Sequence, residues 1–310
     1  MKVELIRPNG FCHGVVSAIR RALTTIDETD NIYVLGMIIH NKIVVDELEK
    51  LGVKTIDDKT KTRLELLDEI DTGTVIFTAH GVSDAVRRKA VEKGLNVVDA
   101  TCKDVDKTHK VIKEHLALGY DIIYVGKHFH PETEGCVSID ESINLVTNLE
   151  DVKELKINSD KIIITNQTTL SILDIQPIID EITRKYPQVQ FINEICKATE
   201  MRQRAIIDAT DADLIIIVGD ERSNNTQKLV DLGNQRAGVH TIRIASLKDL
   251  DINVLKGKQL VKVSAGASTP ALTIKQVVEF INEFDEKDHS TWAKPKDVED
   301  VLNMYKQKSL

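Results

Sequence analysis

The chain has 310 residues, of which 42% are hydrophobic and 29% charged, a composition typical of a globular protein with a substantial core. Its formal charge of −8 and isoelectric point near 5.7 argue against a general nucleic-acid-binding role, which needs a basic face. No run approaches the roughly 18 apolar residues of a membrane span, and the N-terminus lacks the layout of a signal peptide. We therefore expect a cytoplasmic protein that binds neither membranes nor nucleic acid.

Strand and helix patterns alternate along almost the whole chain. Several apolar runs, such as 214–218, are continuous aliphatic segments that suit burial on both faces of a parallel sheet. Amphipathic stretches such as 82–93 and 273–284 predict helices between the strands. This alternation is typical of an α/β fold with mainly parallel sheets. The predicted strands are 3–6, 32–35, 74–77, 97–99, 122–125, 145–147, 162–165, 189–192, 214–218, 241–244 and 260–263.

Three of the four cysteines share one setting, which divides the chain into similar parts. Cys12, Cys102 and Cys196 each follow a predicted strand and precede a predicted helix, at intervals of 90 residues (12 to 102) and 94 residues (102 to 196). Each interval holds about four strands with their helices. We therefore predict three similar α/β modules, residues 1–100, 101–194 and 195–284. A C-terminal tail, residues 285–310, follows them, with a short helix from 296 to about 306 and Trp292 as its packing residue.

The three repeated cysteines suggest a shared metal. The chain has no CxxC pair, which disfavours a zinc knuckle and a thioredoxin-type site, and cytosolic thiols are expected to be reduced. A helix N-terminus stabilises a thiolate, but three converging thiolates need a cation to neutralise them. An iron–sulfur cluster held by three cysteines leaves one iron open to a substrate. Cys136 lies outside the repeat, and we expect it to be a small buried residue.

Polar side chains follow most of the predicted strands, at the sheet edge where ligands of open parallel sheets bind. Histidines that follow strands directly can bind phosphate oxygens as cations, and hydroxyl and amide groups at helix starts can bind the same anion. Glu132, two residues beyond one of these histidines, is a candidate proton donor. No Walker A or GxGxxG motif supports nucleotide binding. The candidate anion-binding residues are His40, His80, His130, Thr168, Ser223, Asn225 and Ser268.

Eight motifs, in order from residue 10 to about residue 270, resemble the 4-hydroxy-3-methylbut-2-enyl diphosphate reductase family, which serves the non-mevalonate isoprenoid pathway. Their number and order make the resemblance far more specific than any one motif. They cover nearly the whole chain outside the tail. The motifs are GFCHGVVSAI, IIHNKIVVDEL, TAHGVS, DATCKDVDKTH, HPETEG, TNQTTLS, EICKATEMRQ and SAGASTP.

The resemblance implies three α/β modules in a pseudo-threefold trefoil around a central [4Fe–4S] cluster, with Cys12, Cys102 and Cys196 as ligands and an open apical iron. The implied reaction removes the allylic hydroxyl of the substrate with two electrons and two protons, giving isopentenyl and dimethylallyl diphosphate. Glu132 would donate a proton, and a ferredoxin or flavodoxin would supply the electrons. The implied diphosphate-binding residues are His40, His80, His130, Thr168, Ser223, Asn225 and Ser268.

Some residues depart from the family pattern without removing a proposed ligand or the acid. Asn224 stands where the family often has a second serine, and its amide can still donate a hydrogen bond to the substrate. Lys103 and Ser138 replace a common proline and a common glycine. Asn224 also keeps open a shifted substrate within the family.

Two functions of other classes stay open from the residues alone. A thiol enzyme would use Cys12 or Cys196 as nucleophile with a histidine base, and it leaves two cysteines without a role. A non-catalytic module would hold zinc with three cysteines and a histidine, and it leaves Glu132 unexplained.

Overall fold

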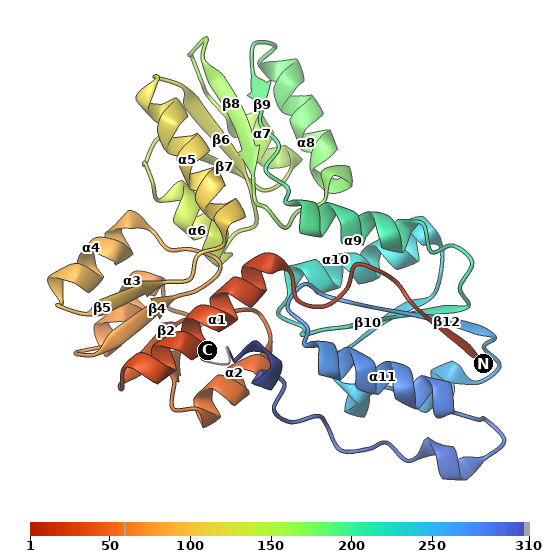
Figure 1. Cartoon of the computed structure of the whole chain (residues 1–310). Helices are drawn as coiled ribbons and strands as arrows, with labels where there is room; N and C mark the ends of the chain where they lie inside the picture. Colours follow the sequence, from red (N-terminus) through yellow and green to blue (C-terminus); the bar gives the residue numbers. More distant parts are fainter. Residues whose placement is uncertain (59, 307–310) are drawn as a thin grey trace. The chain divides into compact units, whose positions relative to one another are not determined.

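The computed structural model describes residues 1–58 and 60–306, and its strands form three four-stranded sheets in which every pair is parallel (Figure 1). This confirms the predicted α/β class. The first sheet has the order β3-β2-β4-β5, the second β7-β6-β8-β9 and the third β11-β10-β12-β1. The strands are β1 (Lys2–Leu5), β2 (Ile32–Leu35), β3 (Lys54–Ile56), β4 (Thr74–Phe77), β5 (Asn96–Asp99), β6 (Asp121–Val125), β7 (Asn144–Val146), β8 (Ile162–Asn166), β9 (Gln190–Phe191), β10 (Leu214–Val218), β11 (Thr241–Ile244) and β12 (Leu260–Ala265).

The three sheets share one topology. If the strands of each sheet are numbered 1 to 4, with β1 counted as the fourth strand of the third sheet, the spatial order is 2-1-3-4 in all three. The third sheet obtains its fourth strand from the N-terminus, because β1 pairs with β12 in a register that joins Lys2 to Leu260. The predicted module 1–100 did not anticipate this pairing.

Helices connect the strands, as the amphipathic patterns predict. By contacts the chain divides into a one-sheet unit (Met1–Arg20, Ile39–Leu51 and Lys197 onward, with the third sheet) and a two-sheet unit (Arg21–Ile38 and Gly52–Cys196, with the first and second sheets). The α-helices of the described residues are α1 (His13–Glu28), α2 (Lys42–Lys50), α3 (Arg63–Leu66), α4 (Asp84–Glu92), α5 (Lys103–Ala117), α6 (Pro131–Val137), α7 (Leu149–Glu154), α8 (Ile172–Lys185), α9 (Lys197–Ile207), α10 (Asn224–Leu232) and α11 (Ala271–Glu283). None of the helices in the described ranges is both long and apolar enough to cross a membrane.

The third sheet shows how the apolar runs become a core. All five residues of β10, Leu214–Val218, are fully buried. Alternate residues of the strand face opposite ways, so Ile216 packs in a cluster with Val277 and Phe280 of α11, while Ile215 packs with residues of α9 and α10. Helices therefore cover both faces of this sheet (Figure 1). Each face buries enough apolar area to fix the carboxyl ends of the strands, where the predicted site residues lie.

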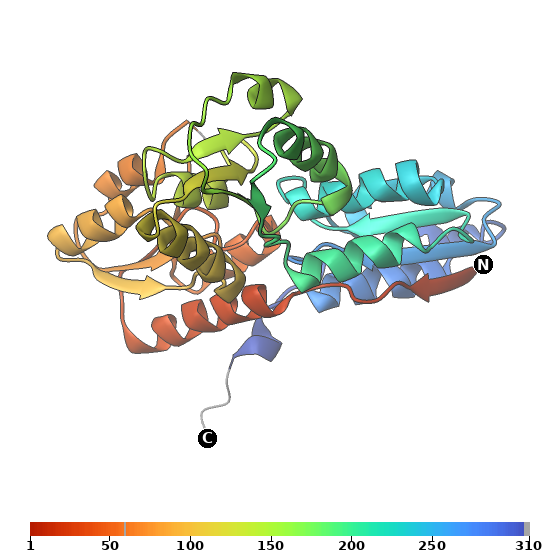
Figure 2. The same cartoon turned by 90° about the horizontal axis from the view of Figure 1, so that it is seen from above.

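The C-terminal tail differs from the prediction. The helix expected over 296–306 is absent from the described residues, which hold only short 3-10 turns at His289–Trp292 and Asn303–Tyr305. The segment is too short for an isolated helix, and it is bound instead by side chains: Val301 is fully buried, and the Tyr305 ring lies 5.2 Å from that of Phe11. The last described turn thus lies beside the start of α1 (Figure 2). Trp292 packs on the Phe284 ring, as predicted.

Candidate functional site

The three repeated cysteines occupy the same position in three equivalent sheets. Each follows the fourth strand of its sheet, and the next residue begins a helix: α1 after Cys12, α5 after Cys102 and α9 after Cys196. Each cysteine N–H donates a 3.0 Å hydrogen bond to a carbonyl two residues beyond the neighbouring strand. The three acceptors are Ala267 after β12, Ala79 after β4 and Thr168 after β8. The same backbone hydrogen bond therefore holds each of the three cysteines at the start of a helix, within its own unit.

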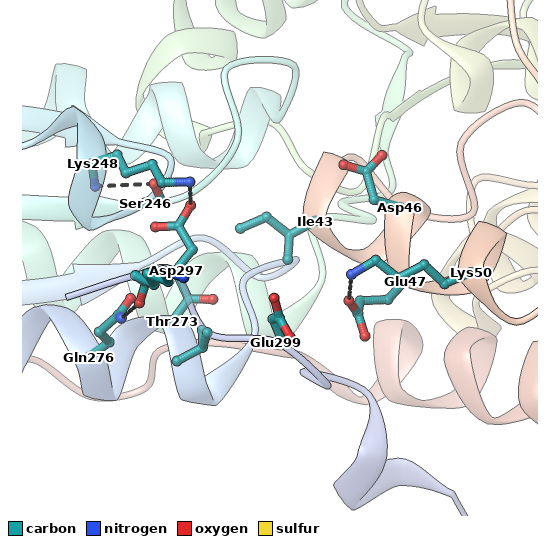
Figure 3. A pocket seen from close by; sticks show the side chains of 12 residues that line it. Ile43, Asp46, Glu47, Lys50, Ser246, Lys248, Thr273, Gln276, Asp297 and Glu299 are labelled. Atoms are coloured by element: carbon teal, nitrogen blue, oxygen red, sulfur yellow. Dashed lines mark hydrogen bonds and ion pairs between the residues drawn. The ribbon is translucent and has the colours of Figure 1, made fainter.

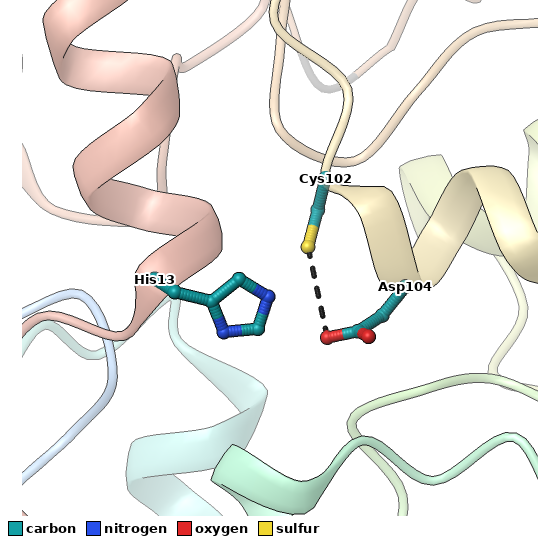
Figure 4. Close-up of side chains that lie close together, drawn as sticks. All are labelled: His13, Cys102 and Asp104. Atoms are coloured by element: carbon teal, nitrogen blue, oxygen red, sulfur yellow. Dashed lines mark hydrogen bonds between the residues drawn. The ribbon is translucent and has the colours of Figure 1, made fainter.

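The environment of these thiols suits metal ligation, and that of the fourth cysteine does not. Cys12, Cys102 and Cys196 form no disulfide among the described residues and are partly exposed, whereas Cys136 is fully buried. Burial raises the pKa of the Cys136 thiol well above its ordinary value, so Cys136 remains a neutral core residue. Soft thiolates at the ends of strands are the donor set that iron–sulfur clusters take. Figure 4 shows Cys102 in this setting, with its Sγ 3.9 Å from the Asp104 carboxylate.

The two-sheet unit brings together two of the three predicted histidines. His80 follows Ala79 directly, and its ring lies 5.6 Å from that of His130, edge to face. His130 is the N-cap of α6, and its Nδ1 accepts a 3.2 Å hydrogen bond from the Glu132 N–H. Because Nδ1 accepts, a neutral His130 ring carries its proton on Nε2. The ring therefore presents a donor at Nε2 and an acceptor at Nδ1.

Glu132 is a buried acid held by Thr168. Its side chain accepts hydrogen bonds from the Thr168 N–H at 2.7 Å and from the Thr168 hydroxyl at 3.1 Å, and the residue is 1% exposed. Burial raises the pKa of Glu132 to about 7, against the lowering effect of the two Thr168 hydrogen bonds. The carboxyl group therefore holds a proton during part of the time at neutral pH and can transfer it.

The one-sheet unit holds the remaining predicted residues. The hydroxyl of Ser268 donates to the His40 carbonyl at 2.9 Å, so these two residues are adjacent. Ser223 is the N-cap of α10, and its side chain accepts from the Thr226 N–H. Asn224 is the first residue of that helix. Asn225 is 5% exposed, and neither its amide nitrogen nor its amide oxygen has a hydrogen-bond partner among the described residues. Because a buried amide without a partner is costly, Asn225 is suited to a polar ligand.

Sequence reasoning missed one residue that supports this group. Asp220 follows β10, and its carboxylate accepts a 2.8 Å hydrogen bond from the Lys42 N–H. The bond joins the start of α2, two residues after His40, to the loop that leads to α10. An acid two residues after a buried strand was the available signal, but only the fold shows its partner.

A cavity of about 450 Å³ lies elsewhere in the one-sheet unit, between α2, α11 and the tail (Figure 3). None of the predicted site residues lines it. Its wall is held by an ion pair of 2.7 Å between Lys248 and Asp297 and by a 2.5 Å hydrogen bond from the Gln276 side chain to the Lys296 carbonyl. These contacts bind the tail to the unit, and we assign the cavity no part in the chemistry.

The comparisons with known proteins agree with these features. The family model described as LytB protein matches residues 3–282. A 4-hydroxy-3-methylbut-2-enyl diphosphate reductase of Geobacillus sp. (strain WCH70) is 49% identical, with 96% of each chain covered. Its counterpart in Bacillus subtilis (strain 168) is 48% identical, with 94% of each chain covered. Among solved structures, the E-1-hydroxy-2-methyl-but-2-enyl-4-diphosphate reductase of Plasmodium falciparum superposes with a TM-score of 0.84 at 32% identity, over 98% of both chains.

Proposed function

Because the chain belongs to the LytB family of 4-hydroxy-3-methylbut-2-enyl diphosphate reductases, we propose that it converts 4-hydroxy-3-methylbut-2-enyl diphosphate to isopentenyl and dimethylallyl diphosphate. The reaction consumes two electrons and two protons and releases the allylic hydroxyl as water. It takes place in the cytoplasm, with a ferredoxin or flavodoxin as electron donor. The observation that carries the proposal is the identical placement of Cys12, Cys102 and Cys196 at the ends of three equivalent sheets.

The three cysteines would hold a [4Fe–4S] cluster, which supplies the electrons and one open iron when it is bound. The same backbone hydrogen bond at each cysteine supports this assignment, because it presents each thiol at a helix start. The predicted modules, 1–100, 101–194 and 195–284, each contribute one of these ligands, and we propose that they surround the cluster with pseudo-threefold symmetry.

The substrate diphosphate would be bound by the polar groups that follow the strands. The rings of His80 and His130 lie edge to face, and His130 would donate a hydrogen bond from its Nε2–H to a phosphate oxygen. Asn225 offers an amide whose hydrogen-bonding capacity the described protein does not use. An overall charge of −8 makes such local donors necessary for an anionic substrate. The full set we propose is His40, His80, His130, Thr168, Ser223, Asn224, Asn225 and Ser268.

Glu132 would donate a proton during the reaction. Its pKa of about 7 suits an acid that gives up a proton at neutral pH and regains one in each turnover. Thr168 orients the carboxyl group through the hydrogen bonds from its N–H and hydroxyl. Since Cys196 N–H bonds to the Thr168 carbonyl, one residue links the acid to a proposed cluster ligand.

Anaerobic purification, iron and sulfide analysis and turnover with reduced methyl viologen test the function in one experiment. We expect near four irons per chain and conversion of 4-hydroxy-3-methylbut-2-enyl diphosphate. A cluster without turnover would indicate a shifted substrate. A colourless, air-stable protein with activity would favour the thiol enzyme, and stoichiometric zinc without sulfide would favour the zinc module.

A further inference from the structure

His109 is a buried titratable side chain to which the proposed reaction gives no role. It lies on α5, the helix that begins directly after Cys102, and is 8% exposed. Burial lowers the pKa of His109 to about 4, with a further lowering by the charges of Lys113 and Arg87. The ring is therefore neutral at physiological pH.

The His109 ring lies against two glycines, each next to a proposed site residue. A Cβ added to Gly135 would stand 3.4 Å from His109 Nε2, and one added to Gly81 would stand 3.5 Å from His109 Cε1. Gly81 follows His80 in the turn after β4, and Gly135 lies one helical turn after Glu132 on α6. The ring thus lies where a side chain at either glycine would be in van der Waals contact with it, so one side chain stands beside both segments.

We propose that His109 is a positioning residue that sets the spacing between the turn carrying His80 and the helix carrying Glu132. All of these residues lie in the two-sheet unit. The edge-to-face contact of the His80 and His130 rings joins the same two segments, because His130 caps α6. A change in the His109 ring therefore moves both a diphosphate-binding histidine and the acid. The inference rests on the proposed function.

Stability alone does not account for an imidazole at this position. His109 Nε2 is buried and has no hydrogen-bond partner among the described residues, so an apolar side chain would avoid the cost of its desolvation. The ring lies instead between two residues that present no side chain to it, Gly81 in the turn and Gly135 on α6. Its place between these two segments, and not a hydrogen bond of Nε2, is the feature that gives it a role.

The test is a double-mutant cycle between His109 and Gly135. Gly135→Ala favours the helix intrinsically, and its methyl group would stand 3.4 Å from His109 Nε2, in ordinary van der Waals contact, so this variant is expected to fold and to keep most of its activity. We expect His109→Ala to lower kcat/KM about tenfold with unchanged iron content, because it leaves the space between the two segments empty. In the double variant the methyl group occupies part of that space, and we expect kcat/KM at least about threefold above that of His109→Ala.

Two further measurements separate positioning from general destabilisation. Ile182→Ala serves as the matched control, since Ile182 is fully buried on the opposite face of the second sheet, and it should lose stability without a change in kcat or KM. Inorganic diphosphate should bind to anaerobically purified His109→Ala about tenfold more weakly than to the wild type by calorimetry. Strictly multiplicative losses in the cycle, or unaltered diphosphate binding, would overturn the proposal. A wild type without turnover would instead refute the proposed function.

Discussion

Glu132→Gln should make the protein more stable at alkaline pH while abolishing most of its turnover. Glutamine keeps the shape of the side chain and can still accept the hydrogen bond from the Thr168 N–H, but it cannot ionise or donate the proposed proton. The variant therefore measures two effects of the buried carboxyl group separately: its effect on stability and its contribution to turnover.

The magnitude follows from the pKa of Glu132, which burial raises from 4.5 to about 7. The difference of about 2.5 corresponds to about 3 kcal/mol at 1.36 kcal/mol for each pKa unit. Below pH 4.5 the carboxyl group is protonated in the folded and unfolded chains alike, and the wild type loses nothing. As the pH rises through 4.5 to 7, the unfolded chain releases its proton first, so the free energy of unfolding falls. Above about pH 7 the full loss is present.

Urea unfolding of the wild type and the variant, matched for iron content, measures this difference between pH 5 and pH 8.5. The stability advantage of Glu132→Gln should widen from under 1 kcal/mol to about 3 kcal/mol across this range. Glu134→Gln, which makes the same substitution on the same helix at a partly exposed residue, is the control. An advantage that stays constant with pH would show that burial does not perturb Glu132, and the reasoning would fail.

Four other substitutions test separate features of the structure. Cys12→Ser should lose both the cluster and activity, and iron analysis measures this; a fully loaded, active variant contradicts the ligand assignment. Cys136→Ser should keep its iron, but its free energy of unfolding should fall by about 1–2 kcal/mol because the new hydroxyl is buried, and urea unfolding measures this. Asn225→Ala should raise KM about tenfold with little change in kcat, and steady-state kinetics with an unchanged KM would remove Asn225 from the substrate site. Phe129→Gly should raise the free energy of unfolding by about 1 kcal/mol, because Phe129 is fully exposed at a φ of 58° that favours glycine; an unchanged urea midpoint would count against strain at this residue.

The sequence predicted most of the fold because its strands are strongly apolar. All eleven predicted strands exist. The missed strand, β3, has three residues at the sheet edge, and Lys54 and Thr55 give it no apolar signal. The tail helix was wrong because the segment is too short to be stable as an isolated helix, and burial of Val301 binds it to the protein in another conformation. The pairing of β1 with β12 was not visible either, since no local pattern encodes contacts between the two ends of a chain.

For the candidate site, too, some features were predictable from the sequence and others are visible only in the fold. Residue type and position after a strand were enough to select the cysteines, the histidines and Glu132. Burial was not predictable from type: only the fold shows that Glu132 is enclosed by Thr168 and that Asn225 has an unused amide. The supporting roles of Asp220 and His109 depend on contacts between distant segments, and local spacing carries no record of them.

Because β1 pairs with β12 in the third sheet, the three cysteines obtain their backbone hydrogen bonds at different times during synthesis. During synthesis, Cys102 and Cys196 meet their carbonyl acceptors, Ala79 and Thr168, soon after they leave the ribosome, because each acceptor precedes its cysteine. Cys12 is made first but waits for Ala267, near the end of translation. Cys12 is thus the first of the three cysteines to be synthesised and the last to form its backbone hydrogen bond. A nearly complete polypeptide is therefore needed before all three proposed cluster ligands have their backbone hydrogen bonds, and a truncation before β12 removes the acceptor of Cys12 alone.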